Sequence, residues 1–140
     1  MDTGIFSQIN WLAVTAAAIA YFVLGAIWYS KTLFGTRWAT LVGMDMNDPN
    51  KNRGMAKMFT TTLILIIVTC IGLAILVNRL DLVFLLSGLK LGLLTGICFA
   101  TTAVSISFIY ESRPTGLYFI DCGYHLVGHI VAAIILSLWR

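Results

Sequence analysis

The stretch Met58–Val77, MFTTTLILIIVTCIGLAILV, decides the fold, because it runs for 20 residues without a charged side chain. A lipid bilayer has a hydrocarbon core about 30 Å thick, and an α-helix needs roughly 20 apolar residues to cross it. The stretch is rich in β-branched residues, but an open strand would leave its backbone polar groups unpaired in lipid. It is therefore predicted to be a transmembrane helix.

Three further apolar stretches of similar length accompany this one. The predicted helices cover about 9–30, 49–79, 82–109 and 117–139, the second starting early because Asp48 offers an N-cap before Pro49. With 59% hydrophobic and 11% charged residues and a mean hydropathy of +0.92, the 140-residue chain has too little polar material to cover a water-soluble surface. We predict an all-α membrane protein, a four-helix bundle forming one domain over residues 1–140.

The residues at the ends of the spans predict how the chain sits in the bilayer. The expected interfacial anchors are Trp11, Trp28, Tyr29, Trp38 and Trp139. An amphipathic helix over about 32–43, ended by Gly43, is expected to lie on the inner membrane surface. The N-terminal residues carry an acid and neither Lys nor Arg, so no cleaved signal peptide is expected.

Basic residues predict the orientation. The first loop carries Lys31, Arg37, Lys51, Arg53 and Lys57, and the third carries Arg113, whereas the opposite side has Arg79 and Arg140. By the positive-inside rule, loops 1 and 3 are expected to be cytoplasmic and both termini outside, in a bacterial inner membrane. The net charge of +3 is small and lies beside membrane segments, so no nucleic-acid partner is expected.

A row of ionisable residues in the fourth span is the candidate functional site. Asp121, His125 and His129 lie four residues apart and so share one face of a helix. Three interpretations stay open: polar contacts that only hold helices together, a proton or ion path, and a metal site at His125 and His129. The metal interpretation is the weakest, because the glutamate of an HExxH helix is missing. No cofactor is expected.

Lys90 is the only basic residue well inside a predicted span. It lies at a different depth from Asp121, about 18 Å away along the helix axes, so the two are not expected to pair within one chain. Lys90 is expected either to snorkel outward, which we favour, or to face the bundle and extend the polar row of the fourth span.

A row of small residues in the third span predicts close helix packing. Gly88, Gly92, Gly96 and Ala100 recur every four residues, which lets another helix backbone approach. The partner helix stays open between the alanine-rich first span and another subunit. A small bundle with such a row is expected to self-associate, as a dimer.

Four short motifs resemble one known family. They are NWLAV at Asn10–Val14, LGAIWYS at Leu24–Ser30, LFGTRW at Leu33–Trp38 and GYHLV at Gly123–Val127. Together they resemble the small four-helix membrane family catalogued as domain of unknown function 1761, whose members often have asparagine where this chain has Asp121. The resemblance implies a four-helix fold in the membrane and implies no activity.

Three functional classes follow from the sequence. The first is a non-catalytic membrane protein that binds itself or a partner, the second is a small transporter or channel for protons, ions or small solutes that uses Asp121, His125 and His129, and the third is a membrane-embedded metal enzyme. An enzyme is the less favoured expectation, because no nucleophile elbow or phosphate-binding loop is present.

Overall fold

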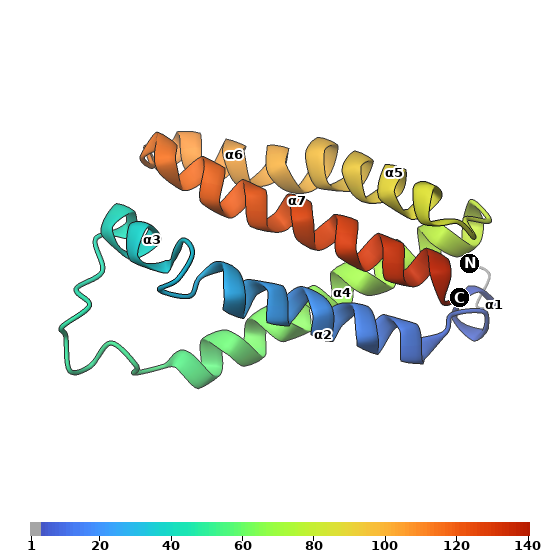
Figure 1. Ribbon diagram of the computed structural model, residues 1–140, viewed down its shortest axis with the longest axis horizontal. Coiled ribbons are helices and arrows are strands. Elements are labelled where there is room, and N and C mark those ends of the chain that lie inside the picture. The colour runs from blue at the N-terminus through green and yellow to red at the C-terminus, as the bar shows by residue number, and fades with distance from the viewer. Residues whose placement is uncertain (1–3) are drawn as a thin grey trace.

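The computed structural model describes residues 4–140, so Met1–Thr3, on which part of the signal-peptide expectation rests, lie outside the described residues. All regular elements in this range are helices, as predicted. They are α1 (Gly4–Ser7), α2 (Trp11–Trp28), α3 (Gly35–Val42), α4 (Met55–Arg79), α5 (Leu85–Thr95), the π-helix η1 (Gly96–Thr101), α6 (Thr102–Tyr110) and α7 (Thr115–Leu138) (Figure 1). Because α5, η1 and α6 are continuous, four helical spans are long and apolar enough to cross a membrane.

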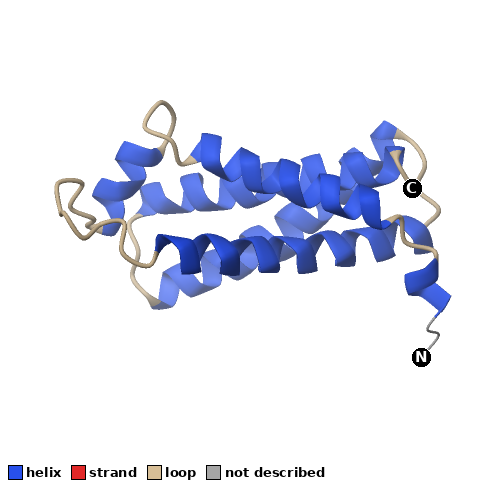
Figure 2. Cartoon of the chain, turned by 90° about the horizontal axis from the view of Figure 1, so that it is seen from below, coloured by secondary structure: helices blue, strands red, loops and turns tan. Residues whose placement is uncertain are grey.

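The four spans run side by side, and the connecting segments gather at two ends (Figure 2). The end that holds α1, residues 80–84 and the C-terminus is called the terminal end here (Figure 1). The opposite end, with residues 29–54 and 111–114, is called the loop end. Helix α7 is central, because α2, α4 and the α5–η1–α6 span all pack against it, and the last of these takes its main contacts from α7 alone.

The observed ends of α3 and α4 show where local sequence signals succeed and fail. Gly43 ends α3 in the left-handed conformation, with φ of 73°, as predicted. Helix α4 begins at Met55, not at about 49, so that predicted start is wrong. Asp48 instead accepts a hydrogen bond from the backbone N–H of Asn50 in a local turn. Gly54 has a left-handed backbone conformation, with φ of 83°, so the helix does not extend back through it. Residues 49–54 are exposed and have no apolar face to bury.

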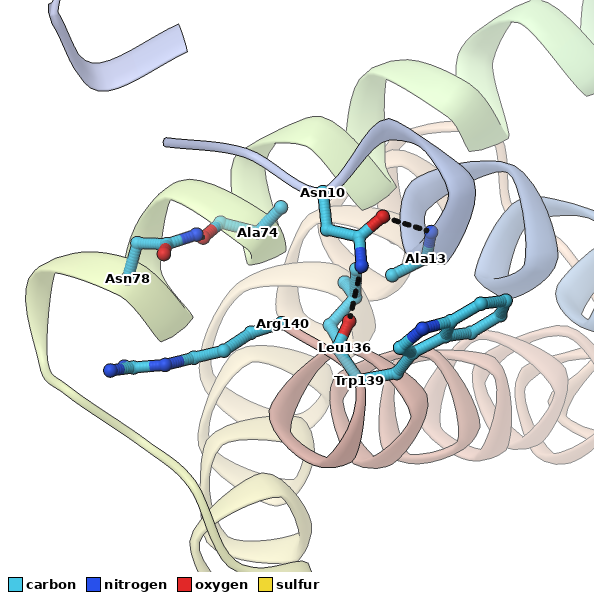
Figure 3. A pocket seen from close by; sticks show the side chains of 7 residues that line it. All are labelled: Asn10, Ala13, Ala74, Asn78, Leu136, Trp139 and Arg140. Atoms are coloured by element: carbon cyan, nitrogen blue, oxygen red, sulfur yellow. Dashed lines mark hydrogen bonds between the residues drawn. The ribbon is translucent and has the colours of Figure 1, made fainter. Parts of the chain in front are cut away.

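The terminal end is tightly closed. The Asn10 side chain caps α2 by accepting from the backbone N–H groups of Leu12 and Ala13, and its amide donates to the carbonyl of Trp139 at 3.4 Å (Figure 3). The hollow beside these groups has no room for a water molecule. Arg140 pairs with Asp81 across the same end, at 2.5 Å.

The glycine row of the third span packs against α7. A Cβ added at Gly88 would meet Ser137 and the Ala133 carbonyl, one at Gly92 would meet the backbone of Ile130, and one at Gly96 would meet Leu126. The partner is therefore α7, which was neither of the two expected partners. Such close backbone contact is how helices associate in lipid.

The π-helix shifts this contact row after Gly96. Ala100, the fourth member of the predicted row, is half-buried, while Thr101 and Ser105 lie beside Cys122 of α7. A π turn accommodates about one more residue than an α turn, so the packing face moves from a four-residue to a five-residue step. The even spacing in the sequence did not predict this change.

Candidate functional site at the α2–α7 interface

The structure places Asp121, His125 and His129 on α7 beside tyrosines of α2. The Tyr21 hydroxyl lies 3.0 Å from Nδ1 of His125 and 3.3 Å from Nδ1 of His129. Tyr21 itself is 2% exposed, and Gly128 lies against its ring where a Cβ would not fit. The two histidines are thus joined through one phenol oxygen supplied by another helix.

The contacts of the two rings fix their hydrogens when both are neutral. Nδ1 of His129 lies 2.8 Å from the carbonyl of His125, and because a carbonyl only accepts, this Nδ1 carries a hydrogen. Nε2 of His129 is then an acceptor. The Tyr21 hydroxyl donates to Nδ1 of His125, its nearest acceptor, so Nε2 of His125 carries the hydrogen. The single Nδ1 hydrogen of His129 is shared between the His125 carbonyl at 2.8 Å and the Tyr21 oxygen at 3.3 Å, and this longer contact completes a short relay from His129 through Tyr21 to His125.

The outer nitrogens of this relay are open. Among residues 4–140, Nε2 of His125 and Nε2 of His129 make no hydrogen bond to the protein. In that range only one fully buried side-chain oxygen or nitrogen lacks a hydrogen-bond partner, and it is Thr101 Oγ1. The two unpaired Nε2 atoms are therefore not fully buried. Both keep some accessible area, on side chains that are half-buried near the middle of α7.

Asp121 belongs to a second polar contact nearer the loop end. Its carboxylate accepts a hydrogen bond of 2.6 Å from the Tyr29 hydroxyl. Tyr124 lies between this pair and the relay, with its ring centroid 5.3 Å from that of Tyr29 and 5.4 Å from that of Tyr21. No hydrogen bond among the described residues connects the two groups, so edge-to-face aromatic packing joins them.

The polar cluster ends near the middle of the bundle. Toward the terminal end the interior is filled by small apolar side chains, with Ala17, Ala132 and Ala133 each 0% exposed. The buried polar residues Thr95 and Ser137 donate to carbonyls of their own helices. In this conformation the interior ionisable side chains Asp121, His125 and His129 therefore lie in one half of the bundle, and the buried polar groups of the other half bond within their own helices.

Of the other residues singled out in the sequence, Trp38 adjoins the cluster, with its ring centroid 5.6 Å from that of Tyr29, whereas Lys90, Trp11 and Trp139 lie apart from it. Lys90 is exposed on the outside of α5 and makes no ion pair with Asp121. Trp11 and Trp139 are each 50% exposed at the terminal end. Trp28 is partly buried and its indole N–H donates to the carbonyl of Ile120 at 3.0 Å. Residues 4–140 contain no group of three His, Cys, Asp or Glu side chains placed to hold a metal ion.

Sequence reasoning missed the contribution of α2 to this site. Tyr21 was not singled out and Tyr29 was expected only as an interfacial anchor. A signal was present, since Tyr21, Gly25 and Tyr29 lie four residues apart, the same spacing as Asp121, His125 and His129. Two antiparallel helices with equal polar spacing can match along their length, and here they do.

Four membrane-length helices with a half-height polar cluster define a small integral membrane protein. The model of the family described as "Protein of unknown function (DUF1761)" matches residues 12–137. The chain belongs to this family, as the sequence motifs suggested. No curated protein and no solved structure matches the chain.

Proposed function

We propose that the chain is a non-catalytic membrane protein that self-associates as a dimer through the face that exposes His125 and His129. The open Nε2 atoms carry this proposal. An unpaired polar group in hydrocarbon costs several kcal/mol, so a polar neighbour should face them. The exposed apolar side chains give no reason for a second copy to bind, because lipid tails cover them equally well.

A second copy is the simplest polar neighbour. In a twofold dimer the same patch of each chain meets, so the imidazole edges of both copies would face one another or shared water. The basic loop end favours insertion of both copies in one orientation, with that end in the cytoplasm and the terminal end outside, in a bacterial inner membrane. The glycine row cannot form this interface, because α7 already covers it.

The test is subunit counting in liposomes over a range of lipid-to-protein ratios. Wild-type protein should give two-step photobleaching, and the double variant His125→Leu, His129→Leu should shift toward single steps. Lys90→Leu, which removes an exposed polar side chain elsewhere, is the matched control and should remain dimeric. Single steps for the wild type, or an unaffected double variant, would refute self-association through this face.

Proton or ion passage is the second candidate function, and the His129–Tyr21–His125 relay favours it. Each member can accept a hydrogen on one side and donate on the other, which is what proton transfer needs. Because the terminal half is apolar, passage would also need helix movement or a second chain.

A pH-sensitive dye in proteoliposomes tests passage directly. Wild-type protein should dissipate a pH gradient and Tyr21→Phe, which keeps the ring and removes the relay oxygen, should lose most of that flux. Asp121→Asn should also reduce it. Tyr110→Phe, at a side chain that is 87% exposed, is the control. A wild-type rate equal to that of empty liposomes would eliminate this candidate.

A further inference from the structure

A cavity of about 320 Å³ opens on the opposite side of α7, between that helix and the η1–α6 segment. Its walls include Thr101, Ser105, Tyr118, Phe119, Cys122 and Leu126. The lining is mostly apolar and contains no charged side chain. The volume is at the lower end of the range for small-molecule sites, which is about 300–1,000 Å³.

Thr101 is the unusual member of this lining. Thr60, Thr69, Thr95 and Thr102 each donate to the carbonyl four residues earlier in their own helix. The Thr101 hydroxyl is buried and makes no such bond. It closes the π-helix, where the wider turn displaces the carbonyl beneath the side chain. In a native structure a buried polar atom without a partner calls for a specific explanation.

The neighbouring polar atoms do not satisfy Thr101. The Ser105 hydroxyl has Cys122 Sγ as its partner at 3.5 Å, and Cys122 Sγ lies 3.7 Å from the Thr101 carbonyl. Sulfur is a weak donor and a weak acceptor. Besides the Tyr118 phenol, the cavity wall therefore contains two hydroxyl groups with little or no hydrogen bonding of their own, and that of Thr101 is covered in this conformation.

We propose that this cavity binds an uncharged, lipid-soluble molecule that carries a single carbonyl or hydroxyl oxygen, such as a long-chain alcohol or ketone. Its apolar part would fill the cavity and its oxygen would pair with Thr101, after the threonine side chain turns toward it, and with Ser105. A charged headgroup is excluded because nothing in the lining would balance it.

The depth of the cavity distinguishes a free molecule from a phospholipid. Thr101 lies about 13 Å along the helix axis from Tyr110, the loop-end limit of the span. The 26-residue span is about 39 Å long and the hydrocarbon core about 30 Å, so Thr101 lies roughly 9 Å below the core edge. The ester carbonyls of phospholipids lie near that edge. A separate lipid-soluble molecule reaches Thr101 more easily.

Photolabelling in liposomes tests the proposal. The probe is hexadecanol with a diazirine in its chain, and a phosphatidylcholine with a diazirine in an acyl chain is the comparison. Hexadecanol label should concentrate in residues 101–105 and 118–126 and be displaced by unlabelled hexadecanol. Thr101→Val should lower this labelling about five- to tenfold, the effect of one lost hydrogen bond of roughly 1 kcal/mol or slightly more.

Matched variants separate binding from folding. Ser105→Leu should fill the cavity and abolish the label, whereas Ser107→Leu on the exposed side of α6 and Thr102→Val next to Thr101 should label like wild type. Thr101→Val replaces a hydroxyl by a methyl of similar size, so its melting temperature should stay close to that of Thr102→Val. Labelling spread evenly over the outer surface, labelling by the phospholipid alone, or full labelling of Thr101→Val would each overturn the proposal.

Discussion

Replacing Gly92 with alanine should weaken the contact between α5 and α7. The added Cβ would clash with the Cα of Ile130 and lie 2.9 Å from the carbonyl oxygen of His129. Both are backbone atoms, which cannot rotate away as a side chain can. The helices must therefore separate locally, and the contacts that α5 and α7 make on either side of Gly92 loosen with them.

The magnitude follows from two opposing effects. Overpacking of this kind costs about 1–3 kcal/mol. Alanine in place of glycine inside a helix stabilises the folded state by about 0.5–1 kcal/mol. The free energy of unfolding should fall by roughly 0.5–2 kcal/mol, which lowers the folded-to-unfolded ratio between about twofold and thirtyfold.

Gly72 provides the matched control. It lies on α4 and is exposed, and a Cβ added there would have no neighbouring atom within 4 Å. Gly72→Ala should gain the helix stabilisation that alanine gives over glycine without any overpacking, so the free energy of unfolding should stay the same or rise. Reversible unfolding in mixed micelles, followed by circular dichroism, compares the two variants. If Gly92→Ala proved as stable as Gly72→Ala, the close α5–α7 approach would be refuted.

Three further predictions concern the α2–α7 interface. Tyr21→Phe should lower the free energy of unfolding by about 0.6–2 kcal/mol while Tyr110→Phe changes it little, and equal effects in a chemical unfolding assay would contradict the relay. A double-mutant cycle with Tyr29→Phe and Asp121→Asn should show a coupling energy of about 0.5–2 kcal/mol, whereas additive effects would mean that the 2.6 Å contact is not formed. Trp28→Phe should lower the melting temperature, because the indole donor to α7 is lost at a cost of about 1 kcal/mol, and an unchanged melting curve would argue against that bond.

The four spans could be predicted because bilayer thickness converts directly into a length of apolar sequence. The stretch Met58–Val77 lies wholly inside α4, and the other three predicted spans differ from the observed helices by a few residues at each end. The start of α4 could not be predicted in the same way. At Asp48–Pro49 a local capping signal competed with exposed, turn-forming residues, and no apolar burial favoured the helix there.

Helix partners were harder to predict than helices. The glycine row at Gly88, Gly92 and Gly96 indicated close packing, but both α2 and α7 offer small residues, such as Ala17 and Ala132, so spacing alone did not choose between them. The same limit hid the polar site, since the role of Tyr21 exists only once α2 and α7 are paired. The four-residue spacing was enough to predict which residues share a face of one helix, but it did not predict which helices pack together.

The packing of α7 explains why polar chemistry is confined to one half of the bundle. Toward the terminal end, Gly88 and Gly92 bring the α5 backbone against α7 and Ala132 is 0% exposed, and the buried Ser137 there bonds only to a carbonyl of its own helix. Toward the loop end the π-helix widens the same span, and the relay lies on one side of α7 and the Thr101 cavity on the other. Passage from the relay through the rest of one chain would require α2 and α7 to separate where Ala17, Ala132 and Ala133 fill the interior. A route between two chains would not require this separation.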